Sequence, residues 1–282
     1  MNAYSMVQDW YVPDREPVEN ALARTTHLGI GAHQDDLEFM AFHGIIECFH
    51  SQEKWFGGII CTDGTGSTHQ GPYANITTAH LAQIRTEEQK QAASVGRYSF
   101  VAQLGLPSGD IGPGRRVVAD LADVLAQMHP RVIYTHSPAD KHPTHLRVLV
   151  AVLEALRQIE PAHRPTRLLG CEMWRGLDWM PDVDKVVLDV GGKEHLAAAL
   201  NGVFDSQIAG GKRYDLAVAG RRRANATLLD SHSGDALTEA AFAMDLAPLI
   251  GANTSDLVDF TLQYVDRFRN DIHTKLQNAL VQ

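Results

Sequence analysis

Cysteine is scarce in this sequence of 282 residues, which contains three. Cys48, Cys61 and Cys171 lie far apart and show no CxxC spacing, so they offer no disulfide framework. An odd number of cysteines without such a framework indicates reduced thiols, and on this basis we expect a cytoplasmic protein.

Long apolar runs are also missing. The sequence has no uninterrupted stretch of about 18 apolar residues, so we expect no membrane span. No N-terminal stretch combines a basic start with a short apolar core, so we expect no secretory signal.

Basic residues are outnumbered by acidic ones. The chain has 25 Lys+Arg against 34 Asp+Glu, a formal net charge of -9. Binding to a phosphate backbone requires a basic excess that displaces counterions, so we expect no nucleic-acid partner. Arg221, Arg222 and Arg223 form a small basic cluster, which we interpret as a solvated helix face.

What the sequence does contain is an alternation of short apolar segments with helical patterns. This pattern predicts strands at 27–32, 55–62, 100–106, 131–135, 167–173 and 185–190, and helices at 37–49, 78–95, 116–128 and from the loop at 136–145 through 159. Such alternation is typical of βαβ crossovers. The sequence therefore predicts an α/β, Rossmann-like fold with a mainly parallel sheet flanked by helices.

The two ends of the chain have a different character. Residues 1–25 contain Trp10, Tyr11, Pro13 and Pro17 and are interpreted as an irregular lead-in. From Lys193 onward the sequence predicts additional helices joined by polar turns. We interpret residues 26–282 as a single α/β catalytic domain that includes these C-terminal helices.

Polar loops follow three of the predicted strands, in "GIGAHQDDLEF", "TDGTGS" and "HSPADKHPTH". The carboxyl ends of parallel strands share one rim, where ligands bind. The first loop places His33, Asp35 and Asp36 at the end of a buried strand, which is electrostatically costly unless a divalent cation neutralises the carboxylates. His33 and Asp36 are three apart and have the ligand chemistry of zinc. The alternative is a helix N-terminus with favourably placed acids.

A third ligand is expected from another loop on the same rim, because a catalytic zinc usually has three protein ligands and a water. "DKHPTH" supplies Asp140, His142 and His145 at the start of a helix, with Pro143 stiffening the approach. The alternative is that the two histidines are capping or surface residues.

The two motifs resemble those of the PIG-L/LmbE-like zinc N-deacetylases, which include N-acetylglucosaminyl-phosphatidylinositol de-N-acetylase and the deacetylases of mycothiol and bacillithiol biosynthesis. The family pattern is Ala-His-Pro-Asp-Asp-Glu, then Arg-x-x-Glu on a helix, then Asp-x-His-Pro-Asp-His. Arg85 and Glu88 in "IRTEEQKQAASVG" match the second element. "KEHLAAALNGVFDSQ" is similar to a later Lys…Ser-Gln segment, and the resemblance spans residues 28 to 207.

The resemblance implies a role for each residue of the motifs. His33, Asp36 and His145 would hold zinc or another divalent cation. Asp35 would be the general base, and His142 would help to stabilise the oxyanion.

Three positions depart from the family pattern. Gln34 replaces the usual proline, Leu37 replaces the usual glutamate, and Thr144 replaces an aspartate. That aspartate would ordinarily polarise the neighbouring histidine, so we expect Asp140 to orient His142 in its place.

Other polar and aromatic residues have two interpretations each. Arg85 occupies a position where family members often bind substrate. Asp63 in "TDGTGS" could bond a sugar hydroxyl, or its turn could serve only to reverse the chain. Trp174 and Trp179 could stack on a sugar or pack in the core. His69, His136 and His232 could join the pocket, although we expect surface positions for them.

We therefore expect a zinc-dependent hydrolase that removes an N-acyl group, most simply acetyl, from an amino sugar or glycoside. Asp35 would take the proton of a zinc-activated water, and protonated His142 would meet the charge of the intermediate. Two alternatives stay open, a nucleotide-binding oxidoreductase and a non-catalytic metal- or sugar-binding protein. The first is disfavoured because "GIGAHQDD" lacks the third glycine of a phosphate-binding fingerprint. The resemblance is also compatible with a homo-oligomer.

Overall fold

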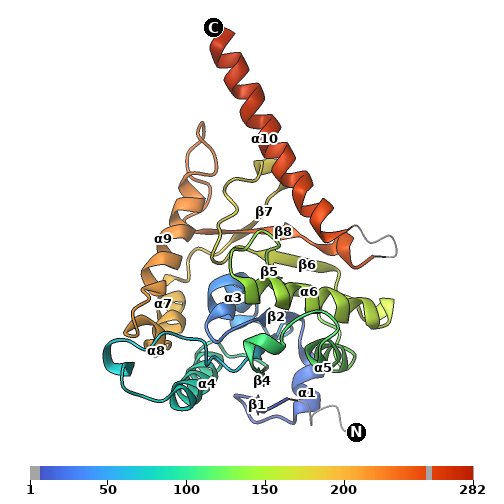
Figure 1. Ribbon diagram of the computed structural model, residues 1–282, viewed down its shortest axis with the longest axis vertical. Coiled ribbons are helices and arrows are strands. Elements are labelled where there is room, and N and C mark those ends of the chain that lie inside the picture. Colours follow the sequence, from blue (N-terminus) through green and yellow to red (C-terminus); the bar gives the residue numbers. More distant parts are fainter. Residues whose placement is uncertain (1–6, 252–255, 282) are drawn as a thin grey trace.

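The computed structural model (Figure 1) describes residues 7–251 and 256–281, which contain one eight-stranded sheet with helices on both faces. The strands are β1 (Asp9–Tyr11), β2 (His27–Gly31), β3 (Phe56–Thr62), β4 (Phe100–Leu106), β5 (Val132–His136), β6 (Arg167–Cys171), β7 (Val186–Asp189) and β8 (Ala240–Asp245). The α-helices are α1 (Val18–Arg24), α2 (Asp36–Met40), α3 (Phe42–Phe49), α4 (Thr78–Val95), α5 (Arg116–Leu125), α6 (Pro143–Gln158), α7 (Glu194–Gly202), α8 (Asp205–Ile208), α9 (Tyr214–Thr227) and α10 (Leu257–Val281). Single 3-10 turns are η2 (Gly71–Tyr73), η3 (Ser108–Asp110), η4 (Pro161–His163), η5 (Asp182–Asp184) and η6 (Ala247–Leu249).

The sheet is mainly parallel, as the sequence predicts. Its order is β1-β4-β3-β2-β5-β6-β8-β7. The strands from β4 through β3, β2 and β5 to β6 are parallel neighbours, whereas β1 and β8 each run antiparallel to the strands beside them. The predicted α/β fold with additional C-terminal helices is confirmed.

Two local predictions are wrong. The lead-in is not irregular, because residues 9–11 form β1, which pairs with β4, and residues 18–24 form α1. The region after Lys193 is not entirely helical, because "AAFAMD" forms β8 between β6 and β7. Alanine and methionine favour helix in isolation, but pairing to β6 and β7 determines the conformation here.

Two apolar layers cover the faces of the sheet. Leu28 and Ile30 of β2 lie in the layer beneath α1, α5 and α6, whereas residues of α2, α3, α4 and α7 form the opposite layer. Gly29 faces this second layer, where a Cβ atom would lie 2.8 Å from Leu37 Cδ2. The absence of a side chain at this position therefore lets α2 and α3 lie close against β2.

The chain order places a crevice beside β2. From β2 the chain passes through β3 to β4 on one side and then returns to β5 on the other side. The loops after β2 and β5 therefore leave the sheet in opposite directions, and such a reversal is where open α/β sheets bind ligands. Figure 1 shows β2 and β5 at the centre of the molecule, with α6 following β5.

Candidate metal centre

The loop between β2 and α2 is a tight turn held by the side chain of Asp36. Its Oδ2 accepts hydrogen bonds from the backbone N–H groups of Ala32, at 2.9 Å, and His33, at 2.7 Å. Asp35 has a φ of 96°, a left-handed conformation that costs a non-glycine residue of order 1–3 kcal/mol and clusters at functional sites. Because Asp36 already occupies these N–H groups, they are not free for a pyrophosphate, which argues against the oxidoreductase alternative.

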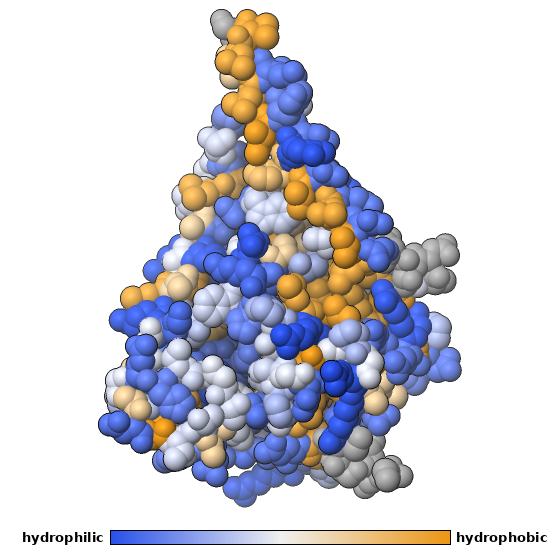
Figure 2. Space-filling view, viewed as in Figure 1, coloured by the Kyte–Doolittle hydropathy of each residue, from blue (hydrophilic) through white to orange (hydrophobic). Residues whose placement is uncertain are grey.

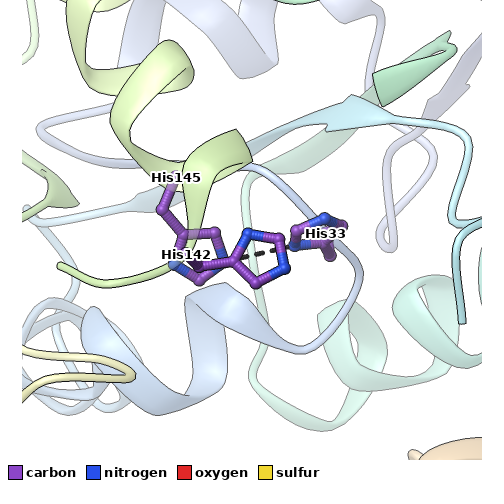
Figure 3. A group of neighbouring side chains, drawn as sticks. All are labelled: His33, His142 and His145. Carbon is purple, nitrogen blue, oxygen red and sulfur yellow. Dashed lines mark hydrogen bonds between the residues drawn. The ribbon is translucent and has the colours of Figure 1, made fainter. Parts of the chain in front are cut away.

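Three predicted ligands meet at one point. His145 Nε2 lies 3.2 Å from His33 Nδ1 and 3.4 Å from Asp36 Oδ1, and His33 Nδ1 lies 3.5 Å from Asp36 Oδ2. Figure 3 shows the His33 ring reaching from its loop toward the histidines at the start of α6. Zinc bonds of 2.0–2.1 Å in a tetrahedron separate neighbouring ligand atoms by about 3.3 Å. The donor types and their spacing fit a divalent cation.

His136 is a further member of this cluster. It is fully buried at the end of β5 and stacks on His145 with a ring separation of 3.8 Å, so the expected surface position is wrong. Donor atoms of Asp36, His136 and His145 lie within 4.8 Å of one another, as do those of His33, His142 and His145. However, His136 Nε2 accepts a hydrogen bond from the Ala32 N–H at 3.0 Å, which occupies the lone pair that a metal would use.

The electrostatics of the cluster suit a positive charge. Burial opposes the ionised form of Asp36, but His145 and His136 hold the pKa of this carboxyl well below its usual value. Burial likewise opposes the charged form of His145, but Asp36 and Asp140 raise its pKa. A carboxylate that stays ionised when fully buried is the partner that a cation requires.

Asp140 contacts the predicted ligand rather than the residue that it was expected to orient. Its Oδ2 lies 3.4 Å from His145 Nδ1 and accepts a hydrogen bond from the Trp174 N–H at 3.1 Å. Its Oδ1 accepts the backbone N–H of His142 at 2.8 Å and has no bond to the imidazole of that residue. The expectation for His142 is therefore corrected: Asp140 orients the ring of His145.

Asp35 lines the same cavity and is almost completely buried. Burial raises its pKa well above the ordinary value, against the opposing influence of the Arg85 guanidinium, whose Nη2 lies 3.7 Å from Asp35 Oδ2. Arg85 also donates to the carbonyl oxygens of Gln34, at 2.6 Å, and Gly64, at 3.3 Å, and to Ser67 Oγ. Most of its donors are therefore directed at the protein, and they fix the loop that carries Asp35.

His142 lies beside the predicted ligands, at the edge of the cavity. Its ring centroid is 5.0 Å from that of His33 and 4.5 Å from that of His145. Burial, together with His145 and His33, lowers the pKa of His142 to about 4. This lowered pKa favours the neutral imidazole at pH 7, whereas the sequence interpretation expects the protonated form.

An open cavity of about 440 Å³ adjoins these residues. Trp174, Lys212 and Tyr214 form one side, and Tyr214 meets the indole of Trp174 edge to face at 5.9 Å. Trp174 thus faces the cavity, whereas Trp179 packs against Phe268 of α10. The remaining lining residues are His33, Asp35, Asp36, Gly66, Ser67, Thr68, Arg85, Ser108, His142, Thr144, Met173 and Gln207.

Asp63 is not among the residues that line this cavity. It lines a separate cleft of about 730 Å³ near β1 and α4. Its Oδ1 accepts hydrogen bonds from the backbone N–H and the hydroxyl of Thr65, at 3.0 and 2.8 Å. These contacts support the chain-reversal interpretation of its turn.

Residues 28–156 match the PIG-L family, described as GlcNAc-PI de-N-acetylase. Over these residues the chain is similar to this family. The N,N'-diacetylchitobiose deacetylase of Pyrococcus horikoshii has the same fold at a TM-score of 0.63 and 15% identity, over 82% of this chain and 86% of that chain. GalB of Pseudomonas putida, the 4-carboxy-2-hydroxymuconate hydratase, has a TM-score of 0.61 and 19% identity, over 82% of this chain and 100% of that chain. A zinc-inhibited form of a teicoplanin deacetylase has a TM-score of 0.53 and 15% identity, over 79% of this chain and 99% of that chain. No curated protein matches the sequence.

The departures from the PIG-L pattern have structural explanations at two positions. The Gln34 amide donates to Thr62 O at 3.3 Å and to Gln103 Oε1 at 3.1 Å, which ties the loop between β2 and α2 to β3 and β4. Leu37 is fully buried under Gly58 in the apolar layer. The neighbouring Glu38 is not in the cavity lining and instead accepts bonds from Gln89 and Tyr98.

One other feature differs from the sequence interpretation. Arg222 is buried rather than solvated, and donates to the carbonyl oxygens of Glu38 and Phe39 at 2.9 and 3.1 Å, at the end of α2. Within residues 7–251 and 256–281, no helix is long and apolar enough to cross a bilayer.

Proposed function

We propose that this protein is a metal-dependent hydrolase that removes an acetyl group from the nitrogen of an amino sugar or glycoside. One observation carries the proposal: the donor atoms of His33, Asp36 and His145 converge at 3.2–3.5 Å beside the carboxylate of Asp35, in an open cavity. A site built only for binding metal would not require a second buried acid that bonds none of these ligands.

His33, Asp36 and His145 would hold the cation, zinc or another divalent ion. The cation supplies Lewis acidity, which makes a nearby water more acidic and polarises an amide carbonyl. Asp35 is proposed to take a proton from the attacking water and to deliver it to the leaving amine. Its burial favours the protonated form, which makes the carboxylate a stronger base than one in water.

His142 is proposed to stabilise the oxyanion as a neutral imidazole. A neutral ring still donates one N–H, and a buried neutral histidine can polarise a carbonyl group. Its lowered pKa favours this form at neutral pH. Asp140 is proposed to act through His145, by fixing the ring whose Nε2 faces the cation.

The substrate class rests on the family description and on the cavity wall. PIG-L is described as GlcNAc-PI de-N-acetylase, and one structural neighbour deacetylates diacetylchitobiose. The rings of Trp174 and Tyr214 offer an apolar surface on which a sugar face can stack, and Lys212 and Ser67 offer polar donors.

The experiment that tests the proposal is an assay for released acetate and free amine on a panel of N-acetylated sugars. The panel includes N-acetylglucosamine, its alkyl glycosides and diacetylchitobiose, each with zinc-loaded and chelator-treated protein. We expect release only from the metal-loaded protein. Because GalB shares the fold, 4-carboxy-2-hydroxymuconate is included as well. Hydration of that compound without any acetate release would overturn the proposal.

The Asp35→Asn variant separates catalysis from metal binding. We expect the turnover number to fall by about 10²–10⁴-fold, the usual contribution of a general base, with the zinc content unchanged. Asp182→Asn, on an exposed turn, is the matched control and should keep full activity. Full turnover in Asp35→Asn would show that another group takes the proton.

A further inference from the structure

The C-terminal helix α10 has a large apolar surface outside the fold. Val258, Leu262, Val265, Ile272 and Leu276 are 62%, 50%, 42%, 41% and 59% exposed. Figure 2 shows an apolar stripe that runs along this helix toward its tip. Exposed apolar surface of this extent marks an interaction site.

The stripe is distinct from the face by which α10 is anchored to the body. Phe260 is buried, Phe268 lies 6.2 Å from the ring of Trp179, and Arg267 pairs with Asp184. These contacts hold the first half of the helix. From Arg269 onward every described residue except Asp271 is exposed, and Figure 1 shows this half extending away from the body. An isolated helix of about 12 residues is only marginally stable in water.

The spacing of the stripe is that of a coiled coil. Its positions 258, 262, 265, 269, 272 and 276 follow one another by steps of four, three, four, three and four residues, with Arg269 as the polar member. Such steps place the residues along one seam that a second helix can cover.

The seam of one α10 matches the seam of a second α10 that runs in the opposite direction. Running a second α10 antiparallel pairs Val258 with Leu276 and Leu262 with Ile272. The same register pairs Val265 with Arg269, whose aliphatic stem can cover the valine. The projecting half of each helix then covers the exposed stripe on the anchored half of the other helix. One two-fold symmetric contact therefore buries the stripes of both helices.

We propose that two copies of this chain associate through an antiparallel pairing of their α10 helices. A parallel pair would place the two Arg269 side chains opposite each other and bring two bodies of net charge -9 side by side. The antiparallel pair keeps the two Arg269 side chains apart and places the two bodies at opposite ends of the helix pair. A membrane surface is a poorer occupant, because α10 carries three acids, Asp259, Asp266 and Asp271, against three bases, Arg267, Arg269 and Lys275, and so has no basic excess.

The first test is the solution mass of the full chain by light scattering. We expect about twice the monomer mass of 31.0 kDa at micromolar concentration. Leu262→Glu/Leu276→Glu should give the monomer mass with unchanged melting of the body. Gln277→Glu, an exposed position off the seam, should keep the double mass. A monomeric wild-type chain, or a dimer that survives the double substitution, would overturn the proposal.

The second test fixes the direction of pairing by cysteine cross-linking. The native Cys48, Cys61 and Cys171 are buried and do not interfere. Leu262→Cys/Ile272→Cys should form an interchain disulfide on mild oxidation, because these positions face each other across the antiparallel pair. Leu262→Cys alone should not, since its two copies would lie about 15 Å apart along the axis. Cross-linking of the single variant would show a parallel pair and refute the register.

Discussion

At the scale of single residues, the cluster depends on contacts that fix each ring in place. Metal-ligating histidines usually donate the N–H of their second ring nitrogen to a carboxylate, a carbonyl or a water. This hydrogen bond orients the ring and raises its basicity. Asp140 supplies this contact to His145, with Oδ2 lying 3.4 Å from Nδ1. The same carboxylate also accepts the Trp174 N–H and therefore joins the ligand loop to the cavity wall.

Asp140→Asn should weaken zinc binding about 10–100-fold, the usual cost of losing such a partner. The asparagine keeps the size of the side chain but removes its charge and replaces one of the two acceptor oxygens by an NH2 group, so the His145 ring loses its anionic partner. A competition titration with a chromophoric chelator measures the change. Asp178→Asn, at an exposed position, is the control. An unchanged affinity would mean that Asp140 serves only the backbone of its loop.

His27 predicts a pH dependence of stability at a position away from the cavity. Burial lowers the pKa of His27 to about 4 from an ordinary 6.5, with Lys54 acting in the same direction. The unfolded chain therefore binds this proton at a higher pH than the folded chain does. Folding stability is lost as the pH falls from about 6.5 to about 4, with a slope of up to ~1.4 kcal/mol per pH unit.

His27→Gln should reduce that slope in urea unfolding between pH 6.5 and 4. Above pH 7, His27 is neutral in both states, so the variant and the wild type should respond to pH in the same way. Equal slopes in the acidic range would contradict the assignment.

At the scale of elements, the position of the cluster follows from the order of the strands. His33 and Asp36 follow β2, and His136 ends β5, the strand that pairs with β2 in parallel. Pro143 begins α6, and His145 lies in the first turn of this helix. The close approach of helices to the sheet depends in turn on glycines, as at Gly44 of α3, where a Cβ atom would lie 2.5 Å from Tyr134 Cε2.

Gly44→Ala should destabilise the fold by about 1–2 kcal/mol, because overpacking against the buried Tyr134 ring outweighs the gain in helix propensity. Gly220→Ala is the matched control, since Gly220 lies in α9 with no atom within 4 Å of its Cβ position. That change should stabilise by about 0.5–1 kcal/mol. Chemical denaturation of both variants measures the two changes in the free energy of unfolding. Changes of the same sign would contradict the packing argument.

Predictability also differs between elements. The sequence predicts α4 and β4 with the bounds that the structure has. Thr77 caps the start of α4 by accepting the His80 N–H, Gly96 follows its end, and β4 is an almost continuously buried segment of 7 residues. The prediction from sequence fails at β1 and β8, which are short and depend on a partner strand that is distant in the chain. Local pattern is informative where an element buries one face by itself, and weak where pairing decides.

At the scale of the whole molecule, the proposed cation would connect distant parts of the chain. His33 and His145 are 112 residues apart in sequence, so their ligand arrangement exists only in the folded state. A ligand that binds only the folded state stabilises it by about 2.7 kcal/mol at 100 times its Kd.

Zinc at that concentration should therefore raise the Tm by roughly 5–10 °C relative to chelator-treated protein, for a domain of this size. His145→Ala should lose this increase, because it removes one ligand and leaves the other two loosely placed. Differential scanning calorimetry with and without zinc measures both. An increase of the same size in His145→Ala would show that the ion binds elsewhere.

The sequence alone identified the motifs, the ligand types and the mainly parallel sheet, because residue chemistry and apolar periodicity are local properties that can be read along the chain. Only the tertiary structure decided which groups meet: that Asp140 contacts His145, that His136 lies within the cluster, that burial and two histidines lower the pKa of His142, and that α10 leaves a second apolar face exposed. These features depend on burial and on contacts between segments far apart in sequence, where packing rather than spacing sets distance and charge.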